Sequence, residues 1–137
     1  MAQKIKAINA FRPRLEQGIT VQKYELVRAV SRATSLVEGS VDLVTKEMRD
    51  QIILFCSAGR AVKVEGLGTF TPTIDLAGNI AISFRADSAF ANGLNMPGSF
   101  NGRILNRENI GKSGNELVAL WNETNPEDQV EVDPEAN

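Results

Sequence analysis

The stretch that decides the fold is Ala58-Gly59-Arg60-Ala61-Val62-Lys63-Val64-Glu65-Gly66-Leu67-Gly68-Thr69-Phe70. Gly59 is a typical helix stop. After it, Val62 and Val64 alternate with polar residues, as in a half-buried strand. Gly66-Leu67-Gly68 then interrupts the strand pattern, which indicates a bulge or sharp bend where backbones approach closely. The stretch therefore predicts a helix followed by bent β-structure.

Two helices are predicted before this stretch. The first begins after Thr20, a favourable N-cap residue, and its apolar residues keep helical spacing to about Thr34. The second runs from about Val37 to Ala58 along one continuous apolar stripe. Its last turns, Ile52 to Cys56, are apolar on every side, and so short a chain has too little other structure to cover them. We therefore expect a dimer whose interface includes Ile52, Ile53, Phe55, Cys56 and Phe70.

A β-hairpin and a short helix are predicted after the stretch. Ala77-Gly78-Asn79 is a turn signal. Ile80, Ile82 and Phe84 then alternate with smaller or polar residues and form the returning strand. A short helix from about Asp87 to Leu94 closes this part, so the fold class is α+β.

The two ends of the chain look different from this middle part. Residues 1–19 contain Pro13, which is excluded from a central strand position, and we expect an edge strand or an extended arm there. Residues 95–137 are predicted to be a Gly- and Asn-rich linker, a short helix capped by Ser113, and an acidic tail without structure after Pro126. The expected organisation is thus 1–19, 20–94 and 95–137.

Composition narrows the possible functions. The chain has no histidine and one cysteine, which removes the commonest general base and leaves no ligand set for structural zinc. We therefore expect a non-catalytic protein with no metal, cofactor or small-molecule substrate. Its longest apolar run is Ile52 to Cys56, far too short to span a bilayer, so a cytoplasmic location without membrane contact is expected.

Charge is distributed unevenly along the chain. Residues 1–112 contain all 15 Lys and Arg against 10 Asp and Glu, whereas residues 113–137 contain seven acidic residues and no base. A basic body with an acidic tail is a pattern found in nucleic-acid-binding proteins, and it also fits a solvated surface with a disordered acidic end.

The segment from Glu25 to Pro72 resembles the HU/IHF family of bacterial histone-like DNA-bending proteins. Gly59, Val62, Gly66, Gly68 and Phe70 match the Gly-x-x-Val and Gly-Phe-Gly-Asn/Ser-Phe pattern of that family. Phe84-Arg85 is similar to its Phe-Lys/Arg-Pro-Gly. The resemblance covers roughly residues 20–94, and it implies an intertwined dimer located in the nucleoid.

This sequence also departs from the family pattern. Family members grip DNA with two long basic β-arms, each tipped by a proline that inserts between base pairs. Here the strands are joined by a short segment, its tip is Leu76-Ala77-Gly78-Asn79, and no Lys or Arg lies between Lys63 and Arg85.

Two functions remain open. The first is weak, sequence-independent binding of duplex DNA, in which Lys63 and Arg85 contact phosphates with help from Arg60 and the backbone amides around Gly66 and Gly68. The alternative is a protein–protein interaction or structural module on an HU-like scaffold that has lost its arms. The sequence also leaves open whether the second subunit is another copy or a paralogue.

Overall fold

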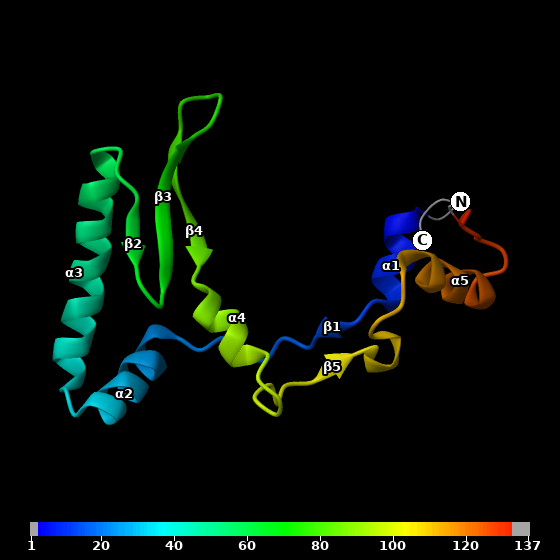
Figure 1. Ribbon diagram of the computed structural model, residues 1–137, viewed down its shortest axis with the longest axis horizontal. Coiled ribbons are helices and arrows are strands. Elements are labelled where there is room, and N and C mark those ends of the chain that lie inside the picture. Colours follow the sequence, from blue (N-terminus) through cyan, green and yellow to red (C-terminus); the bar gives the residue numbers. More distant parts are fainter. Residues whose placement is uncertain (1–2, 133–137) are drawn as a thin grey trace. The chain divides into compact units, whose positions relative to one another are not determined.

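The computed structural model describes residues 3–132, and the chain divides into two compact units (Figure 1). The central unit is Ile19–Phe100, and the flanking unit combines the residues up to Gly18 with those from Asn101 onward. The elements are α1 (Lys4–Phe11), β1 (Arg14–Leu15), α2 (Lys23–Thr34), α3 (Glu38–Ser57), β2 (Val62–Val64), β3 (Gly68–Ile74), β4 (Ile80–Ala86), α4 (Ser88–Leu94), β5 (Ile104–Leu105), the 3-10 helix η1 (Arg107–Asn109) and α5 (Gly114–Thr124).

The helices of the central unit agree with the sequence pattern except at one end. The long helix α3 is confirmed, and Gly59 adopts the left-handed conformation just after it, with φ +78°. The first helix of this unit, α2, starts later than predicted. Its N-cap residue is Gln22, which makes no side-chain capping bond, so the expected cap at Thr20 is wrong.

A three-stranded antiparallel sheet in the order β2-β3-β4 follows the helices. Its hairpin turn lies at Asp75 to Asn79, where Gly78 has φ +89°. The Asp75 carboxylate accepts hydrogen bonds from the backbone N–H groups of Asn79 and Ala77, both at 2.9 Å. These bonds lower the pKa of Asp75 below its ordinary value, and the bond from the Asn79 N–H has the largest effect. They also stabilise the turn.

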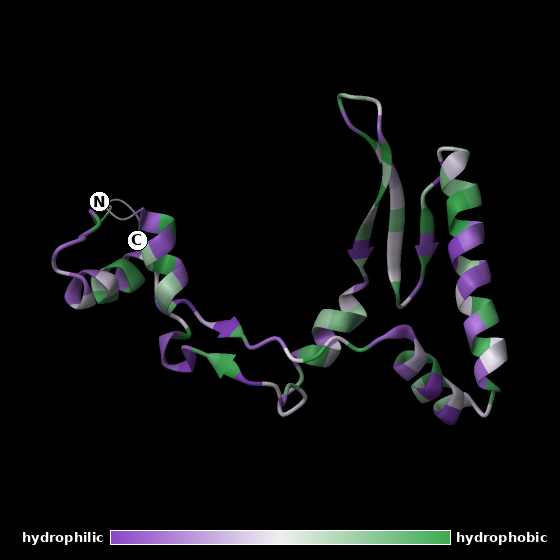
Figure 2. Ribbon diagram, turned by 180° about the vertical axis from the view of Figure 1, so that it is seen from behind, coloured by the Kyte–Doolittle hydropathy of each residue, from purple (hydrophilic) through white to green (hydrophobic). Residues whose placement is uncertain are grey.

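The central unit buries few apolar side chains. Helix α3 contacts β2 and β3, and the rings of Phe70 and Phe84 lie 4.7 Å apart on adjacent strands. Many apolar side chains stay exposed nevertheless, and the C-terminal half of α3 and the outer part of the hairpin are largely hydrophobic (Figure 2). The buried apolar side chains of this unit are Val27, Val41 and Cys56.

The flanking unit corrects the prediction of an edge strand or extended arm for residues 1–19. Residues 4–11 form a helix, α1, which packs against α5. Ala7 on α1 and Val118 on α5 are completely buried, and Trp121 and Val130 complete this small core. Only the two residues of β1 are strand, and they pair with β5.

The segment 95–137 is also more ordered than predicted. It contains β5 and η1 in addition to the expected helix α5, whose cap is confirmed because Ser113 Oγ accepts a hydrogen bond from the N–H of Glu116. Residues 126–132 are not unstructured, since the Asn122 side chain accepts a bond from Val130 N–H at 2.7 Å and donates one to Val130 C=O at 2.8 Å. The rest of the predicted acidic tail, residues 133–137, lies outside the described residues.

Candidate nucleic-acid interface

The register of the sheet brings two predicted DNA-binding residues onto one face. Lys63 of β2 pairs with Thr69 of β3, and Thr69 pairs with Arg85 of β4. Directly opposite residues of antiparallel strands point to the same side, so these three side chains form one row across the sheet. Because neighbouring strands lie about 4.8 Å apart, the two basic side chains start about 10 Å from each other. Both are exposed.

The rest of this face is mostly polar, and the strands that form it contain no acidic residue. Alternation along the strands adds three hydroxyl-bearing residues and one alanine to the row, and none of the three strands contains Asp or Glu. We call this surface the basic face; its residues are Lys63, Thr69, Thr71, Thr73, Ala81, Ser83 and Arg85. Sequence reasoning missed the hydroxyls, although the period-two pattern of Thr69-Phe70-Thr71-Pro72-Thr73 is the signal that places them.

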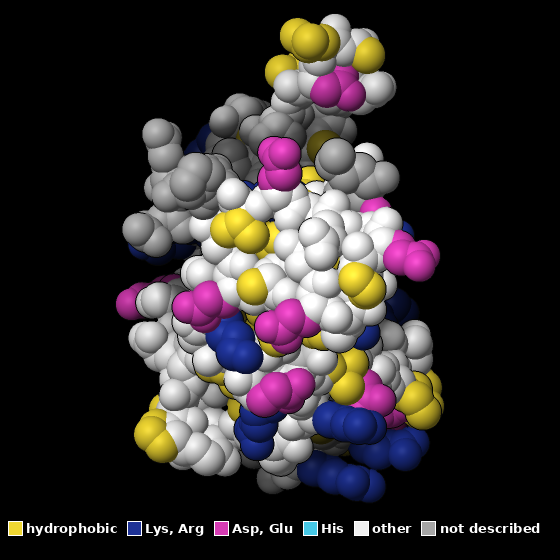
Figure 3. Space-filling view, turned by 90° about the vertical axis from the view of Figure 1, so that its right-hand side faces the viewer, with side chains coloured by type: hydrophobic (Ala, Val, Ile, Leu, Met, Phe, Trp, Pro, Cys, Tyr) yellow, Lys and Arg dark blue, Asp and Glu magenta, His cyan; other side chains and the backbone are white. Residues whose placement is uncertain are grey.

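The opposite face is apolar, and it includes Phe70 and Phe84. Beyond the end of β2, the strands β3 and β4 continue as a short two-stranded hairpin with further apolar residues, namely Pro72, Ile74, Ile80 and Ile82. Leu76 at its tip is fully exposed. The tip is seen at the top of Figure 3, where hydrophobic side chains surround an acidic one.

Arg60 lies outside the row of Lys63 and Arg85. It follows the C-terminal end of α3, and its guanidinium carbon lies 5.4 Å from the centre of the Phe55 ring. This cation–π contact holds Arg60 at the end of the helix.

Gly66 and Gly68 have structural uses at the edge of the basic face. The Gly66 N–H faces the carboxylate of Asp87 at 3.4 Å, and that carboxylate also caps α4 by accepting a bond from Ala89 N–H. Gly68 is buried, and a Cβ placed on it would lie 2.4 Å from the carbonyl oxygen of Arg85. The two glycines therefore allow the turn and the close contact between β3 and β4.

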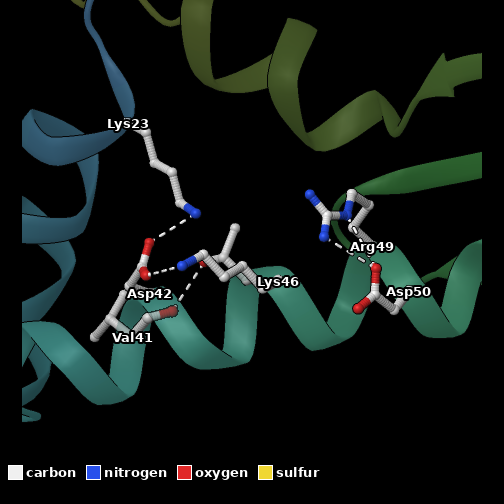
Figure 4. A network of polar contacts seen from close by, with 7 residues as sticks. Lys23, Val41, Asp42, Lys46, Arg49 and Asp50 are labelled. Atoms are coloured by element: carbon white, nitrogen blue, oxygen red, sulfur yellow. Dashed lines mark hydrogen bonds and ion pairs between the residues drawn. The ribbon is translucent and has the colours of Figure 1, made fainter.

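Most basic residues of α2 and α3 are engaged in ion pairs. Lys23 and Lys46 both bind the carboxylate of Asp42, at 2.7 and 2.8 Å, and Arg49 pairs with Asp50 at 3.0 Å (Figure 4). The hydrogen bonds from Lys23 and Lys46 lower the pKa of Asp42 to about 2, and the bond from Lys23 has the larger effect. Within residues 3–132, by contrast, no acidic partner is found for Lys63 or Arg85.

Other kinds of site are not found in the described part of the chain. Among residues 3–132, no group of three or more His, Cys, Asp and Glu side chains could hold a metal ion. No helix in the same range is long and apolar enough to cross a membrane.

A comparison with known protein families identifies the domain type. The sequence model of the HU-HIG family, described as an HU domain fused to wHTH, Ig, or Glycine-rich motif, matches residues 2–95. The chain belongs to the HU-HIG family. The match includes α1 and β1 and ends one residue after α4, so this HU-HIG chain has β5, η1 and α5 beyond its matched part. No curated protein matches the sequence.

The family membership confirms the HU-like resemblance found in the sequence. It also starts the family segment earlier than residue 20, because α1 lies within the match. The HU-HIG assignment concerns the domain type and names no ligand for this chain.

Proposed function

We propose that this chain is a non-catalytic HU-like protein that binds duplex DNA weakly and without sequence preference. The observation that carries the proposal is the row of Lys63, Thr69 and Arg85 on a sheet face free of acidic residues. Lys63 and Arg85, two cations without an acidic partner among residues 3–132, and the neighbouring hydroxyls are suitable contacts for phosphate oxygens. Contacts to phosphate carry no sequence information, so binding of this kind would not depend on sequence.

The proposed binding form is a homodimer. Ile53 and Phe55 remain exposed on α3, Ile52 and Phe70 are half-buried, and Cys56 is buried beside them. An apolar groove of 260 Å³ between α2 and α3 is also open, and Leu26, Val30, Val44 and Met48 are among its lining residues. A second copy would cover these surfaces and double the number of basic faces. Light scattering should then give twice the chain mass at micromolar concentration, and a monomer would contradict the proposed dimer.

The number of contacts limits the affinity. A dimer offers Lys63 and Arg85 twice, and four phosphate contacts give a salt slope of about −3.6 in log Kobs against log[salt]. Affinity should then fall about 150-fold between 50 and 200 mM salt, much less than for a protein with many more contacts. A location in the nucleoid would follow from DNA binding of this kind.

Fluorescence anisotropy of a labelled duplex of about 30 base pairs, titrated at several salt concentrations, tests this proposal. Lys63→Gln/Arg85→Gln should lower the affinity and reduce the slope by about 3.6. Lys46→Gln/Arg49→Gln removes the same charge from paired residues and is the matched control. Equal slopes for both variants and the wild type would place the binding surface elsewhere.

A second candidate function is a protein–protein interaction or structural module. The outer hairpin favours it, because it has no base and Leu76 at its tip is fully exposed. Absence of DNA binding even at low salt would support this alternative over the first.

A further inference from the structure

A second basic surface lies on the flanking unit, on the ribbon formed by β1 and β5. Arg14 pairs with Leu105, Leu15 pairs with Ile104, and the N–H of Glu16 donates to the carbonyl of Arg103 at 2.9 Å. Arg14 and Arg103 therefore share one face of the ribbon. Leu15 and Ile104 lie on the other face.

Two more arginines lie close to the ends of β1 and β5, where α1 ends and η1 begins. Arg12 follows α1 in an extended conformation, and Arg107 begins η1 directly after Asn106. The Asn106 side-chain amide donates to the carbonyl oxygens of Ala10 and Arg12, at 3.2 and 3.1 Å. The backbones at Arg12 and Arg107 are therefore held next to each other. We call the set Arg12, Arg14, Arg103 and Arg107 the arginine ribbon.

The arginine ribbon does not hold the unit together. The two chain segments are joined by the packing of α1 on α5, by the pairing of β1 with β5 and by asparagine amides, including that of Asn109, which is buried and donates to the carbonyl of Phe11 at 2.7 Å. All four arginines are exposed. Only Arg103 has an acidic partner in the described residues, Glu16 at 3.6 Å, and this exposed pair is weak.

The charge of this region is unbalanced. Residues 12–16 and 103–108 contain four arginines against Glu16 and Glu108. The central unit, residues 19–100, has eight basic and eight acidic residues and thus no net formal charge. Net positive charge is therefore more concentrated on the arginine ribbon than on the central unit as a whole.

We propose that the arginine ribbon is a second phosphate-binding surface that contacts the sugar–phosphate backbone of duplex DNA. The inference rests on the proposed function, because the basic face would bring the DNA to the chain and raise its concentration near the tethered flanking unit. Guanidinium groups bind phosphate through two parallel hydrogen bonds. From Arg12 to Glu16 an extended chain spans about 13 Å, which equals the rise of roughly four base pairs along the helix axis at about 3.4 Å each.

The test compares two triple variants of the full chain by anisotropy with the same duplex. Arg12→Gln/Arg14→Gln/Arg107→Gln removes the three ribbon arginines for which the described part of the chain provides no ion pair. Arg28→Gln/Lys46→Gln/Arg49→Gln removes three paired bases from α2 and α3 as the matched control. The first variant should reduce the salt slope by about 2.7 for each ribbon engaged, whereas the control should change it little. Between 50 and 200 mM salt, the wild type should then lose about 40-fold more affinity than the first variant.

Further measurements separate this proposal from the proposed function. Arg12→Lys/Arg14→Lys/Arg107→Lys keeps the charge and should restore the slope, with thermal melting like that of the wild type. If the ribbon variant binds like the wild type while Lys63→Gln/Arg85→Gln has a smaller salt slope, the ribbon proposal is overturned and the basic face is supported as the DNA-binding surface. If the ribbon variant loses slope while Lys63→Gln/Arg85→Gln binds normally, the ribbon stands and the basic face fails. A wild type that binds no DNA at low salt overturns both, and leaves an acidic protein as the partner to examine.

Discussion

Replacing Gly68 by alanine should strongly destabilise the central unit. Gly68 has φ +153°, a conformation that residues with a side chain rarely adopt. An added Cβ would lie 2.4 Å from the carbonyl oxygen of Arg85 and 2.6 Å from a ring carbon of Phe84. The first contact is with backbone, so it cannot be relieved by a change of rotamer.

The expected cost has two parts. The unfavourable backbone conformation costs about 1–3 kcal/mol. Forcing β3 and β4 apart is an overpacking change, which costs about another 1–3 kcal/mol. The sum of about 2–6 kcal/mol is a large part of the 5–15 kcal/mol that typically stabilises a domain. Because Arg85 lies on the displaced strand, the variant should also bind DNA more weakly.

Urea unfolding followed by far-UV circular dichroism at one fixed protein concentration measures this cost. Gly66→Ala is the matched control, since Gly66 has φ +82° but nothing lies within 4 Å of the added Cβ. The control should lose only about 1–2 kcal/mol from its left-handed conformation. If Gly68→Ala is no less stable than Gly66→Ala, the close contact between the strands is not as described and the reasoning fails.

Three further predictions concern single polar groups. The hydrogen bonds from Lys23 and Lys46 lower the pKa of Asp42 to about 2, so their stabilisation is present above the unfolded pKa of about 4 and is lost as the pH falls toward 2. The difference in Tm between wild type and Asp42→Asn should therefore shrink between about pH 4 and pH 2, and a difference that stays constant would contradict this. Asn122→Ala removes both bonds to Val130 and should cost the flanking unit about 1–3 kcal/mol, seen as faster hydrogen exchange of the Val130 amide; unchanged exchange would mean that these bonds do not hold residues 126–132. Ser113→Ala should lower the unfolding free energy by about 1 kcal/mol in urea titrations, while Ser113→Asp retains a cap and should stay near the wild type.

The parts of the fold that depend on local signals could be predicted from the sequence. Helix α3 follows from one apolar stripe and its glycine stop, and the hairpin follows from Ala77-Gly78-Asn79 between alternating residues. The row of Lys63 and Arg85 could be expected only through the family pattern. Its register depends on Gly68 and on the turn between β2 and β3, and the alternation of apolar and polar residues does not specify either of them.

The flanking unit could not be predicted because its stabilising partners are distant in the sequence. Helix α1 buries Ala7 against Val118, and Asn109 binds the carbonyl of Phe11 across 98 residues. The strands β1 and β5 have two residues each, too few to show a period. The arginine ribbon was missed for the same reason, since its members come from both segments.

The flanking unit consists of two segments that are far apart in the sequence, and this separation affects the order in which the two units fold during translation. At about 5–20 residues per second, the ribosome needs roughly 5–20 s to synthesise the stretch between Phe11 and Asn109, which are 98 residues apart. During that time α1 has been made but lacks the helix that covers Ala7, whereas the residues of the central unit, Ile19–Phe100, are added one after another. The nascent chain should therefore acquire the central unit first, and the arginine ribbon only when translation has passed β5.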